Sequence, residues 1–346
     1  MIRTLAHALR PTRLRASVAA LVAVLVAAAC NSTDVTEPTT ATPASTSPAT
    51  ATPAAPAPLA SLSYSGIAYG PTSLFATATS FEWGPAMFTG SQALVSASNI
   101  VTLLNTARQK GHRVVLAMTG GSPSNFMSSG KFDLDKWKRK MSTFNTSTIR
   151  NAVASAVSDG TLIGNTMIDE PETPKWGGNI TKSMIDAMAV YGRNIFPTLP
   201  MGINIGPPAY KWRATERFTK LDWVRYQYSW WVTSGNVNAW RDAVLDQARK
   251  DGVQAAFSMN LLNGGTKDKS GSWDCPQSHK GTYAPNCWMT PDQVRSYGRT
   301  LAQSGGCVMF MWRYDDAFIS RSSNQDAFRD VASAATSATR RSCKRP

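Results

Sequence analysis

Three carboxylates packed around a proline follow one apolar run of this 346-residue chain. The run covers residues 162–168 and leads into Asp169, Glu170, Pro171 and Glu172. Strands that are buried on both faces read as continuous apolar runs, and barrels of alternating strands and helices carry their chemistry at the strands' carboxyl ends. Because proline cannot continue a ladder of hydrogen bonds, we expect the strand to stop where the acids begin. A cluster of this kind could move protons or supply a nucleophile.

The residues that end the other apolar runs are also polar or aromatic. They are Tyr69, Thr119, Asn204, Gln227, Tyr228, Asn260, Asn263, Trp312, Arg313, Tyr314, Asp315 and Asp316. Amides and acids hydrogen-bond hydroxyl groups, and flat rings stack on pyranose faces. Further tryptophans lie in or near the connecting segments, at positions 83, 176, 212, 230, 231, 273 and 288. If the run ends share one edge of a sheet, this set predicts a site for an oligo- or polysaccharide.

From residue 62 onward, short apolar runs alternate with amphipathic stretches, which is the pattern of repeated strand and helix units. Strands are predicted at 64–69, 113–118, 162–168, 200–205, 223–228, 253–259 and 307–312. Helices are predicted at 98–110, 134–143, 149–158, 182–193, 237–250 and 325–335. One more helix should begin at Pro291, because Thr290 and Gln293 form the pattern of a capping box around it.

Seven strands, each followed by a helix, predict an α/β fold of the (β/α)8 TIM-barrel type over residues 61–338, with one strand unassigned. The eighth strand would lie near 82–88 or within 142–149. A doubly wound open sheet is the main rival fold, but no glycine-rich phosphate loop follows the first strand.

This plan resembles the TIM-barrel glycoside hydrolases over most of residues 62–338. The stretch 168–172 is similar to their acid-bearing strand in the middle of the barrel. The stretch 308–312 is similar to the closing strand of chitinase-like enzymes, whose tryptophan, Trp312 in this chain, forms the floor of the sugar site. The resemblance implies carboxylate acid/base catalysis on a saccharide and no cofactor.

Glycoside hydrolysis ordinarily uses two carboxyl groups about 5–10 Å apart. We expect Glu170 to be the proton donor, because it ends the strand and can be desolvated beside aromatic rings. Asp169 is expected to point to the other side and to hold the barrel or tune the site. Asp315 or Asp316 is the preferred remote partner, with Glu172 and Glu82 after them.

Asn260 and Asn263 stand where the large retaining clan of these enzymes would carry a second glutamate. An inverting mechanism through Asp315, a substrate-assisted mechanism that needs only Glu170, and loss of catalysis therefore stay open. The acids could also serve only to cap the next helix, and Trp312 could be part of the barrel core. The rival function is a non-catalytic carbohydrate-binding or envelope structural lipoprotein.

The first thirty residues have the plan of a secretory signal, with arginines followed by an apolar stretch and small residues. The stretch 26–30 resembles a bacterial lipobox, which implies lipidation of Cys30 and an exported protein anchored to a membrane, facing the periplasm or the cell exterior. An ordinary signal peptide cleaved near Ala29 is the alternative. Residues 31–60 are rich in Thr, Ala and Pro, which predicts a disordered tether.

The formal net charge of +14 is concentrated partly at the two ends of the chain. The first fifteen residues and a predicted basic tail at 339–346 hold much of it, which leaves a mildly basic body. Nucleic acid is therefore not expected as a partner.

The cysteines of an exported chain predict disulfides. Cys275 and Cys287 bracket one polar segment and are the preferred pair, while Cys307 opens an apolar strand and is either bridged or a buried thiol. His112 and His279 are too few to complete a zinc site with them, so no metal is expected.

Overall fold

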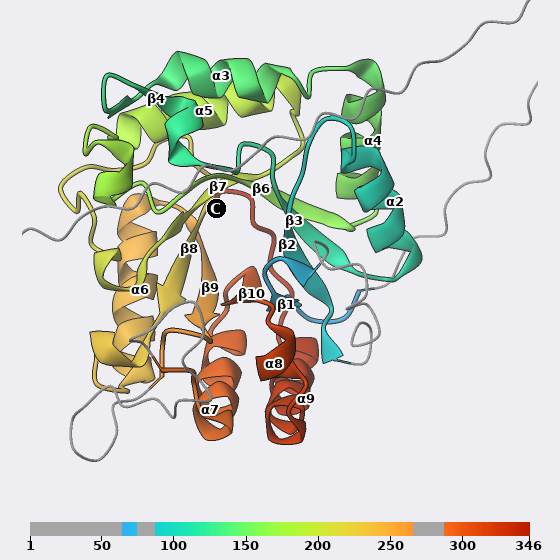
Figure 1. Ribbon diagram of the computed structural model, residues 1–346, viewed down its shortest axis with the longest axis vertical. Coiled ribbons are helices and arrows are strands. Elements are labelled where there is room, and N and C mark those ends of the chain that lie inside the picture. The colour runs from blue at the N-terminus through green and yellow to red at the C-terminus, as the bar shows by residue number, and fades with distance from the viewer. Residues whose placement is uncertain (1–63, 75–86, 266–286) are drawn as a thin grey trace, which may run out of the picture. The chain divides into compact units, whose positions relative to one another are not determined.

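The computed structural model describes residues 64–74, 87–265 and 287–346. Its main sheet has eight strands, all parallel, in the order β1-β10-β9-β8-β7-β6-β3-β2 (Figure 1). The strands are β1 (Ala68–Pro71), β2 (Gly90–Leu94), β3 (Arg113–Ala117), β6 (Leu162–Asp169), β7 (Met201–Ile205), β8 (Trp223–Tyr228), β9 (Gln254–Asn260) and β10 (Val308–Trp312). The outermost strands β1 and β2 meet through the hydrogen bonds Thr89 N to Tyr69 O at 2.8 Å and Ser73 N to Gln92 O at 3.0 Å. These bonds close the sheet, and the predicted (β/α)8 barrel is confirmed.

The helices lie outside the strands (Figure 1). They are α2 (Ile100–Gln109), α3 (Leu134–Ser142), α4 (Ser147–Ser158), α5 (Lys182–Ile195), α6 (Val237–Asp251), α7 (Pro291–Ala302), α8 (Asp316–Ile319) and α9 (Ser322–Ser337). A short hairpin, β4 (Met127–Ser128) and β5 (Lys131–Phe132), precedes α3. The capping box predicted for α7 is present, with Thr290 and Gln293 each accepting a hydrogen bond from the other's backbone N–H. None of the helices in the described ranges is long and apolar enough to cross a membrane.

The strand that sequence patterning left unassigned is β2. The first predicted position is close, because β2 begins just after 82–88, whereas the second is wrong, because 142–149 contains the junction between α3 and α4. The β2 sequence is Gly-Ser-Gln-Ala-Leu, which has no apolar run. Its Ser91 is fully buried and donates to Pro71 O at 2.6 Å, so a polar side chain takes a core position by bonding to the neighbouring strand.

Trp223 fills the lower part of the barrel interior. It belongs to a buried cluster with Ala68, Val115, Ala256 and Phe310, and its indole lies against Gly202. A Cβ atom on Gly202 would come within 2.1 Å of that ring, so only glycine leaves room for it. Because side chains alternate between the two faces of a strand, the next inward position on β8 is Arg225. Trp223 therefore fills the interior below Arg225, and the space above it opens at the carboxyl ends of the strands.

The carboxyl-terminal residues are fastened to the body of the protein. Cys343 forms a disulfide with Cys307, so Cys307 is not a free thiol. Arg345 donates through Nη1 to Leu221 O at 2.9 Å and through Nη2 to Phe218 O at 3.0 Å. The residues expected to form a basic tail thus pack on the barrel.

The other predictions about the chain ends and the second disulfide fall largely outside the described ranges. Cys30, the signal and the tether lie in residues 1–63, and Cys275 lies in residues 266–286. Cys287 does take part in a disulfide. Its pairing with Cys275 stays a prediction.

Candidate functional site

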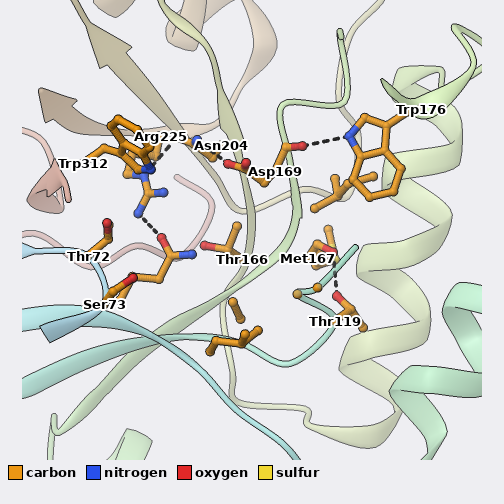
Figure 2. Close-up of a pocket in the computed structure, with 16 residues that line it drawn as sticks. Thr72, Ser73, Thr119, Thr166, Met167, Asp169, Trp176, Asn204, Arg225 and Trp312 are labelled. Carbon is orange, nitrogen blue, oxygen red and sulfur yellow. Dashed lines mark hydrogen bonds between the residues drawn. The ribbon is translucent and has the colours of Figure 1, made fainter. Parts of the chain in front are cut away.

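A cavity of about 240 Å³ opens at the carboxyl ends of the strands (Figure 2). It is lined by Thr72, Ser73, Gln92, Leu94, Ala117, Thr119, Gly120, Gly121, Thr166, Met167, Ile168, Asp169, Trp176, Asn204, Arg225 and Trp312. Hydroxyls, amides, one carboxylate, one guanidinium and two indoles therefore share a space suited to a single small polar molecule.

Asp169 faces this cavity, contrary to the expectation that it would point to the other side. Thr166 pairs with Gly202, but Asp169 rather than Ile168 pairs with Asn204, so β6 has one extra residue here. A bulge of this kind reverses the facing of the residues beyond it. The Asp169 carboxylate then accepts a hydrogen bond from Asn204 Nδ2 at 2.6 Å. Simple alternation along the sequence could not have shown this.

Side chains from neighbouring elements hold the bulged segment. The Met167 carbonyl, which the bulge takes out of the regular ladder, accepts from Thr119 Oγ1 at 2.6 Å and from Trp137 Nε1 at 3.0 Å. The Asp169 carbonyl accepts from Trp176 Nε1 at 2.9 Å (Figure 2). These side-chain donors hold the strand end together with the ladder bond from Glu170 N to Asn204 O at 2.8 Å.

Glu170 turns the chain away from the strand. Its φ of 50° lies in the left-handed region that non-glycine residues rarely adopt. Its carboxylate binds Lys175 Nζ at 3.0 Å, and the same ammonium group lies 3.4 Å from Asp169 Oδ2. Glu170 is not among the residues that line the cavity. The strand stops where the sequence predicted, but the acid that it presents to the cavity is Asp169.

Glu172 is the third acid of the cluster and lies behind the other two. Its Oε1 accepts from Gly206 N at 2.7 Å, while its Oε2 is buried and has no hydrogen-bond partner in the described part of the chain. Burial, aided by the charges of Glu170 and Asp169, raises the pKa of Glu172 to about 7, against the lowering effect of its backbone hydrogen bonds. Near neutral pH the Glu172 carboxyl group is therefore protonated in part of the molecules. Like Glu170, it is absent from the cavity lining.

Arg225, which lies on β8, forms the side of the cavity opposite Asp169. Its Nε donates to Asn204 Oδ1 at 3.0 Å and its Nη1 donates to Gln92 Oε1. Its guanidinium carbon lies 5.9 Å from the centre of the Phe310 ring. Figure 2 shows Asn204 between Arg225 and Asp169, and the hydrogen bonds make a continuous chain from Asp169 through Asn204 and Arg225 to Gln92.

The predicted Trp312 lines the cavity, as a residue at the floor of a sugar site would. It is half-buried at the end of β10 and also packs against the main core. Trp312 is therefore in contact with both the cavity and the barrel core, the two positions that the sequence suggested for it.

Tyr69 and Tyr228 do not line the cavity, so the structure does not bring these two predicted substrate-binding residues to it. Tyr69 donates to Phe328 O at 3.4 Å. The Tyr228 ring contacts the rings of Trp240 and Tyr297, each at a centroid distance of 5.1 Å. These partners lie on α9, α6 and α7, so both tyrosines fill the layer between strands and helices. They stand at outward positions of the alternation, so a place at the end of a strand does not bring them to the cavity.

Gln227 and Asn260 occupy inward positions of β8 and β9 and are buried, but neither lines the cavity. Asp315 caps α8 by accepting from Phe318 N at 2.9 Å. Asp316 accepts from the Tyr314 hydroxyl at 2.6 Å. Neither aspartate lies in the cavity lining, so the structure does not bring Asp315 or Asp316 together with Asp169.

Several lining residues were not identified from the sequence. They are Thr72, Ser73, Gln92, Thr166 and Arg225. A signal for Arg225 was available, since a charged residue inside an apolar strand, two positions before Gln227, must face the interior with it. Gln92 had no such signal, because β2 itself was not recognised.

In the described ranges, no cluster of three or more histidine, cysteine or acidic side chains could hold a metal ion.

Comparisons with known proteins do not identify a family for this chain, so its fold is assigned from the structure alone. No protein-family description matches the sequence, and no curated protein does either. Among solved structures, an endo-1,4-beta-mannanase from Rhizomucor miehei is 10% identical with a TM-score of 0.47, covering 78% of this chain and 94% of its own. A thermostable mutant of a xylanase from Cellvibrio japonicus is 12% identical with a TM-score of 0.44, covering 80% and 99%. A xylanase from Thermobacillus composti is 10% identical with a TM-score of 0.46, covering 78% and 97%. These values are too low to decide function.

Proposed function

We propose that this protein binds an oligo- or polysaccharide at the mouth of its barrel and hydrolyses a glycosidic bond there. The observation that carries the proposal is the cluster of carboxyl groups at the carboxyl end of β6, where Asp169 lines the cavity and Glu170 lies beside it on the same Lys175. Asp169 is held in the cavity by donors from Asn204 and Lys175, which bind a carboxylate. Glu172, in the same cluster, has a pKa of about 7 and so holds a proton for part of the time at neutral pH. Glycoside hydrolysis ordinarily uses one carboxyl group that donates a proton and a second that acts as a nucleophile or base.

Within this proposal, Asp169 is the carboxylate that touches the sugar. Glu170 stays the proposed acid/base partner, because its side chain is partly exposed beside Asp169 and shares Lys175 with it. Glu172 acts through them, since it lies behind the cavity and its charge state sets how much negative charge the cluster carries. Asn204 and Lys175 position the acids.

A second candidate function is saccharide binding without catalysis. One observation favours it, since Asp169 is the sole carboxyl group among the lining residues of the described structure. A hydrolase ordinarily needs two within reach of the bond. Turnover and binding must therefore be measured on the same protein.

The test is a panel of oligo- and polysaccharides, with reducing ends and binding both measured for the wild type, Asp169→Asn and Glu170→Gln. Turnover by the wild type that falls by about 100-fold or more in both variants, with binding kept, supports hydrolysis. Asp315→Asn is the control, because asparagine also caps a helix and this residue is outside the cavity. Binding without turnover would move the assignment to the second candidate. Neither binding nor turnover on any saccharide would reject both.

We also propose that the protein is exported and anchored to a membrane through lipid on Cys30. The support is the arginine-rich and apolar start of the chain, followed by small residues before the cysteine. Mass spectrometry of the mature amino terminus tests this. An acylated Cys30 is expected, and an unacylated start at Asn31 or later would contradict it.

A further inference from the structure

Arg225 is a buried cation with neutral partners. Its side chain is part of a residue that is only 4% exposed, inside the barrel above Trp223. Its two hydrogen bonds go to amide oxygens, those of Asn204 and Gln92, and not to a carboxylate. The nearest acids, Asp169 and Glu170, are bound to Lys175. Across the described residues, Arg225 takes part in no ion pair.

Such an arrangement is costly for the folded protein. A buried charge ordinarily has an opposite charge beside it, because removal from water is not repaid by neutral partners alone. Burial lowers the pKa of Arg225 to about 10, and the more distant charges of Asp169 and Glu170 oppose that shift. The guanidinium is still positively charged at neutral pH. Its charge is not neutralised by any contact that the described structure contains.

The unused part of the guanidinium is directed to the cavity. Nε and Nη1 each donate a hydrogen bond. Nη2 has no hydrogen-bond partner among the described residues, and it is not one of the fully buried polar atoms that lack a partner. Arg225 also lines the cavity, together with the hydroxyl-bearing Thr72 and Ser73. Figure 2 shows Thr72 and Ser73 on the same side as Arg225 and Trp312, away from Asp169.

We propose that the cavity recognises an acidic sugar, whose carboxylate binds the Arg225 guanidinium. This inference rests on the proposed function, because it names the substrate class of the same site. A guanidinium binds a carboxylate with charge and direction that a neutral hydroxyl does not match. Neighbouring hydroxyls can donate to the second carboxylate oxygen. The cavity of about 240 Å³ suits one such sugar unit rather than a long chain segment.

The charges also fix the orientation of the bound sugar. A carboxylate near Asp169 would be repelled, so the acidic group lies on the Arg225 side and the glycosidic oxygen lies on the Asp169 side. Asn204 separates the two groups, with its Nδ2 on Asp169 and its Oδ1 on Arg225. The Asn204 amide therefore fixes the distance between the side that binds the acidic group and the side that cleaves the glycosidic bond.

Calorimetric titration with matched pairs of oligosaccharides tests the proposal. The probes are galacturonate, glucuronate and mannuronate oligomers, and the methyl esters of the same oligomers, which keep the sugar and remove the charge. The wild-type protein should bind at least one acid form about tenfold or more tightly than its ester. Salt should weaken that preference, because part of the attraction is between charges. Equal affinity for every acid and its ester would overturn the proposal.

Variants of Arg225 then test whether this residue causes the preference for the acid over its ester. Arg225→Met should remove it, and Arg225→Lys, which keeps the charge without the planar fork, should keep part of it. Arg295→Gln is the control, since Arg295 lies on the exposed side of α7 and, within the described ranges, forms ion pairs with Asp292 and Asp330 alone. If Arg225→Met does not fold, the comparison of wild type with Arg225→Lys decides. Preference for the acid that is unchanged in a folded Arg225 variant would contradict the assignment.

The same titrations separate this inference from the proposed function. Binding of neutral xylo-, manno- or cello-oligomers without any preference for acids overturns the acidic-sugar inference and leaves the proposed function standing. Tighter binding of sulfated galactan oligomers than of any uronate overturns the choice of a carboxylate in favour of a sulfate ester. Failure of all saccharides to bind overturns both proposals.

Discussion

The Asp169 carboxylate and the Arg225 guanidinium are linked through the two ends of one amide, that of Asn204. Asn204 donates to Asp169 Oδ1 at 2.6 Å and accepts from Arg225 Nε at 3.0 Å. Its amide orientation is therefore determined by its neighbours, because only the NH₂ group can donate and only the oxygen can accept. The buried Asn204 side chain on β7 therefore sets the distance between the carboxylate on β6 and the guanidinium on β8.

Replacement of Asn204 by alanine should destabilise the protein and loosen the site. The variant leaves the buried Arg225 without one acceptor, and an unsatisfied buried group costs about 1–3 kcal/mol. Urea unfolding should show a loss of this size relative to the wild type. Asn194→Ala is the control, because Asn194 is exposed on α5. Equal stability of the two variants would show that the Asn204 bonds contribute little.

The fold could be predicted from the sequence wherever a strand was an apolar run. The run at 223–228 and β8 coincide, and the other recognised strands differ from their predictions by a few residues at the ends. Where a strand is short and polar, as in β2, the pattern gives no signal because its buried serine is satisfied by a neighbouring backbone carbonyl.

The site could be predicted only in part, for two physical reasons. An extra residue in β6 turns Asp169 inward, and a bulge depends on how neighbouring strands pair, which alternation within one strand does not contain. A position at a strand end also does not decide which way a side chain faces, so the sequence predicts Tyr228 in the site although its ring points to the helices. Counting the alternation back from Gln227 would have found Arg225.

The raised pKa of Glu172 predicts a pH-dependent stability. The folded-state pKa is about 7, against an ordinary value of 4.5, so between these values the folded protein binds more protons than the unfolded chain. Its contribution to stability is therefore complete below about pH 4.5 and is lost as the pH rises through 7. After allowance for partial solvation, about 2 kcal/mol should disappear across this window.

Glu172→Gln checks this dependence. The variant cannot ionise, so its unfolding free energy should fall less between pH 5 and pH 8 than that of the wild type, by about the same 2 kcal/mol. Urea unfolding at several pH values measures the difference. Asp292→Asn, an exposed change on α7, should keep the wild-type profile. Parallel profiles for Glu172→Gln and the wild type would show that another group controls the dependence.

The fit of Trp223 on Gly202 predicts a steric cost at the floor of the barrel. Gly202→Ala places a methyl group 2.1 Å from the present ring position, so the indole must move and about 1–3 kcal/mol of stability should be lost. In Trp223→Leu the same methyl group has space, so Gly202→Ala should cost less there. A double-mutant cycle from denaturant unfolding measures the coupling. Additive costs would mean that the indole does not press on Gly202.

The Cys307–Cys343 disulfide should hold the end of the chain to the barrel and stabilise the whole fold. The two residues are 36 positions apart, and in the chain-entropy account closing a loop of this length stabilises by about 3–4 kcal/mol. The double variant Cys307→Ala with Cys343→Ala should lose about that amount in denaturant unfolding. Two substitutions are preferable to a reducing agent, because Cys287 is also disulfide-bonded and would be reduced at the same time.

The same variant distinguishes a constraint on the unfolded chain from simple packing. Both sulfurs are buried, so a pair of small apolar side chains keeps most of the local contacts while the loop is opened. Limited proteolysis should cut the residues after Ala338 faster in the double variant, since the loop is then open and the chain end is held by the hydrogen bonds of Arg345 to Leu221, Phe218 and Asp222. A variant that matches the wild type in stability and in protease resistance would show that the polar contacts of Arg345 suffice to hold the chain end without the disulfide.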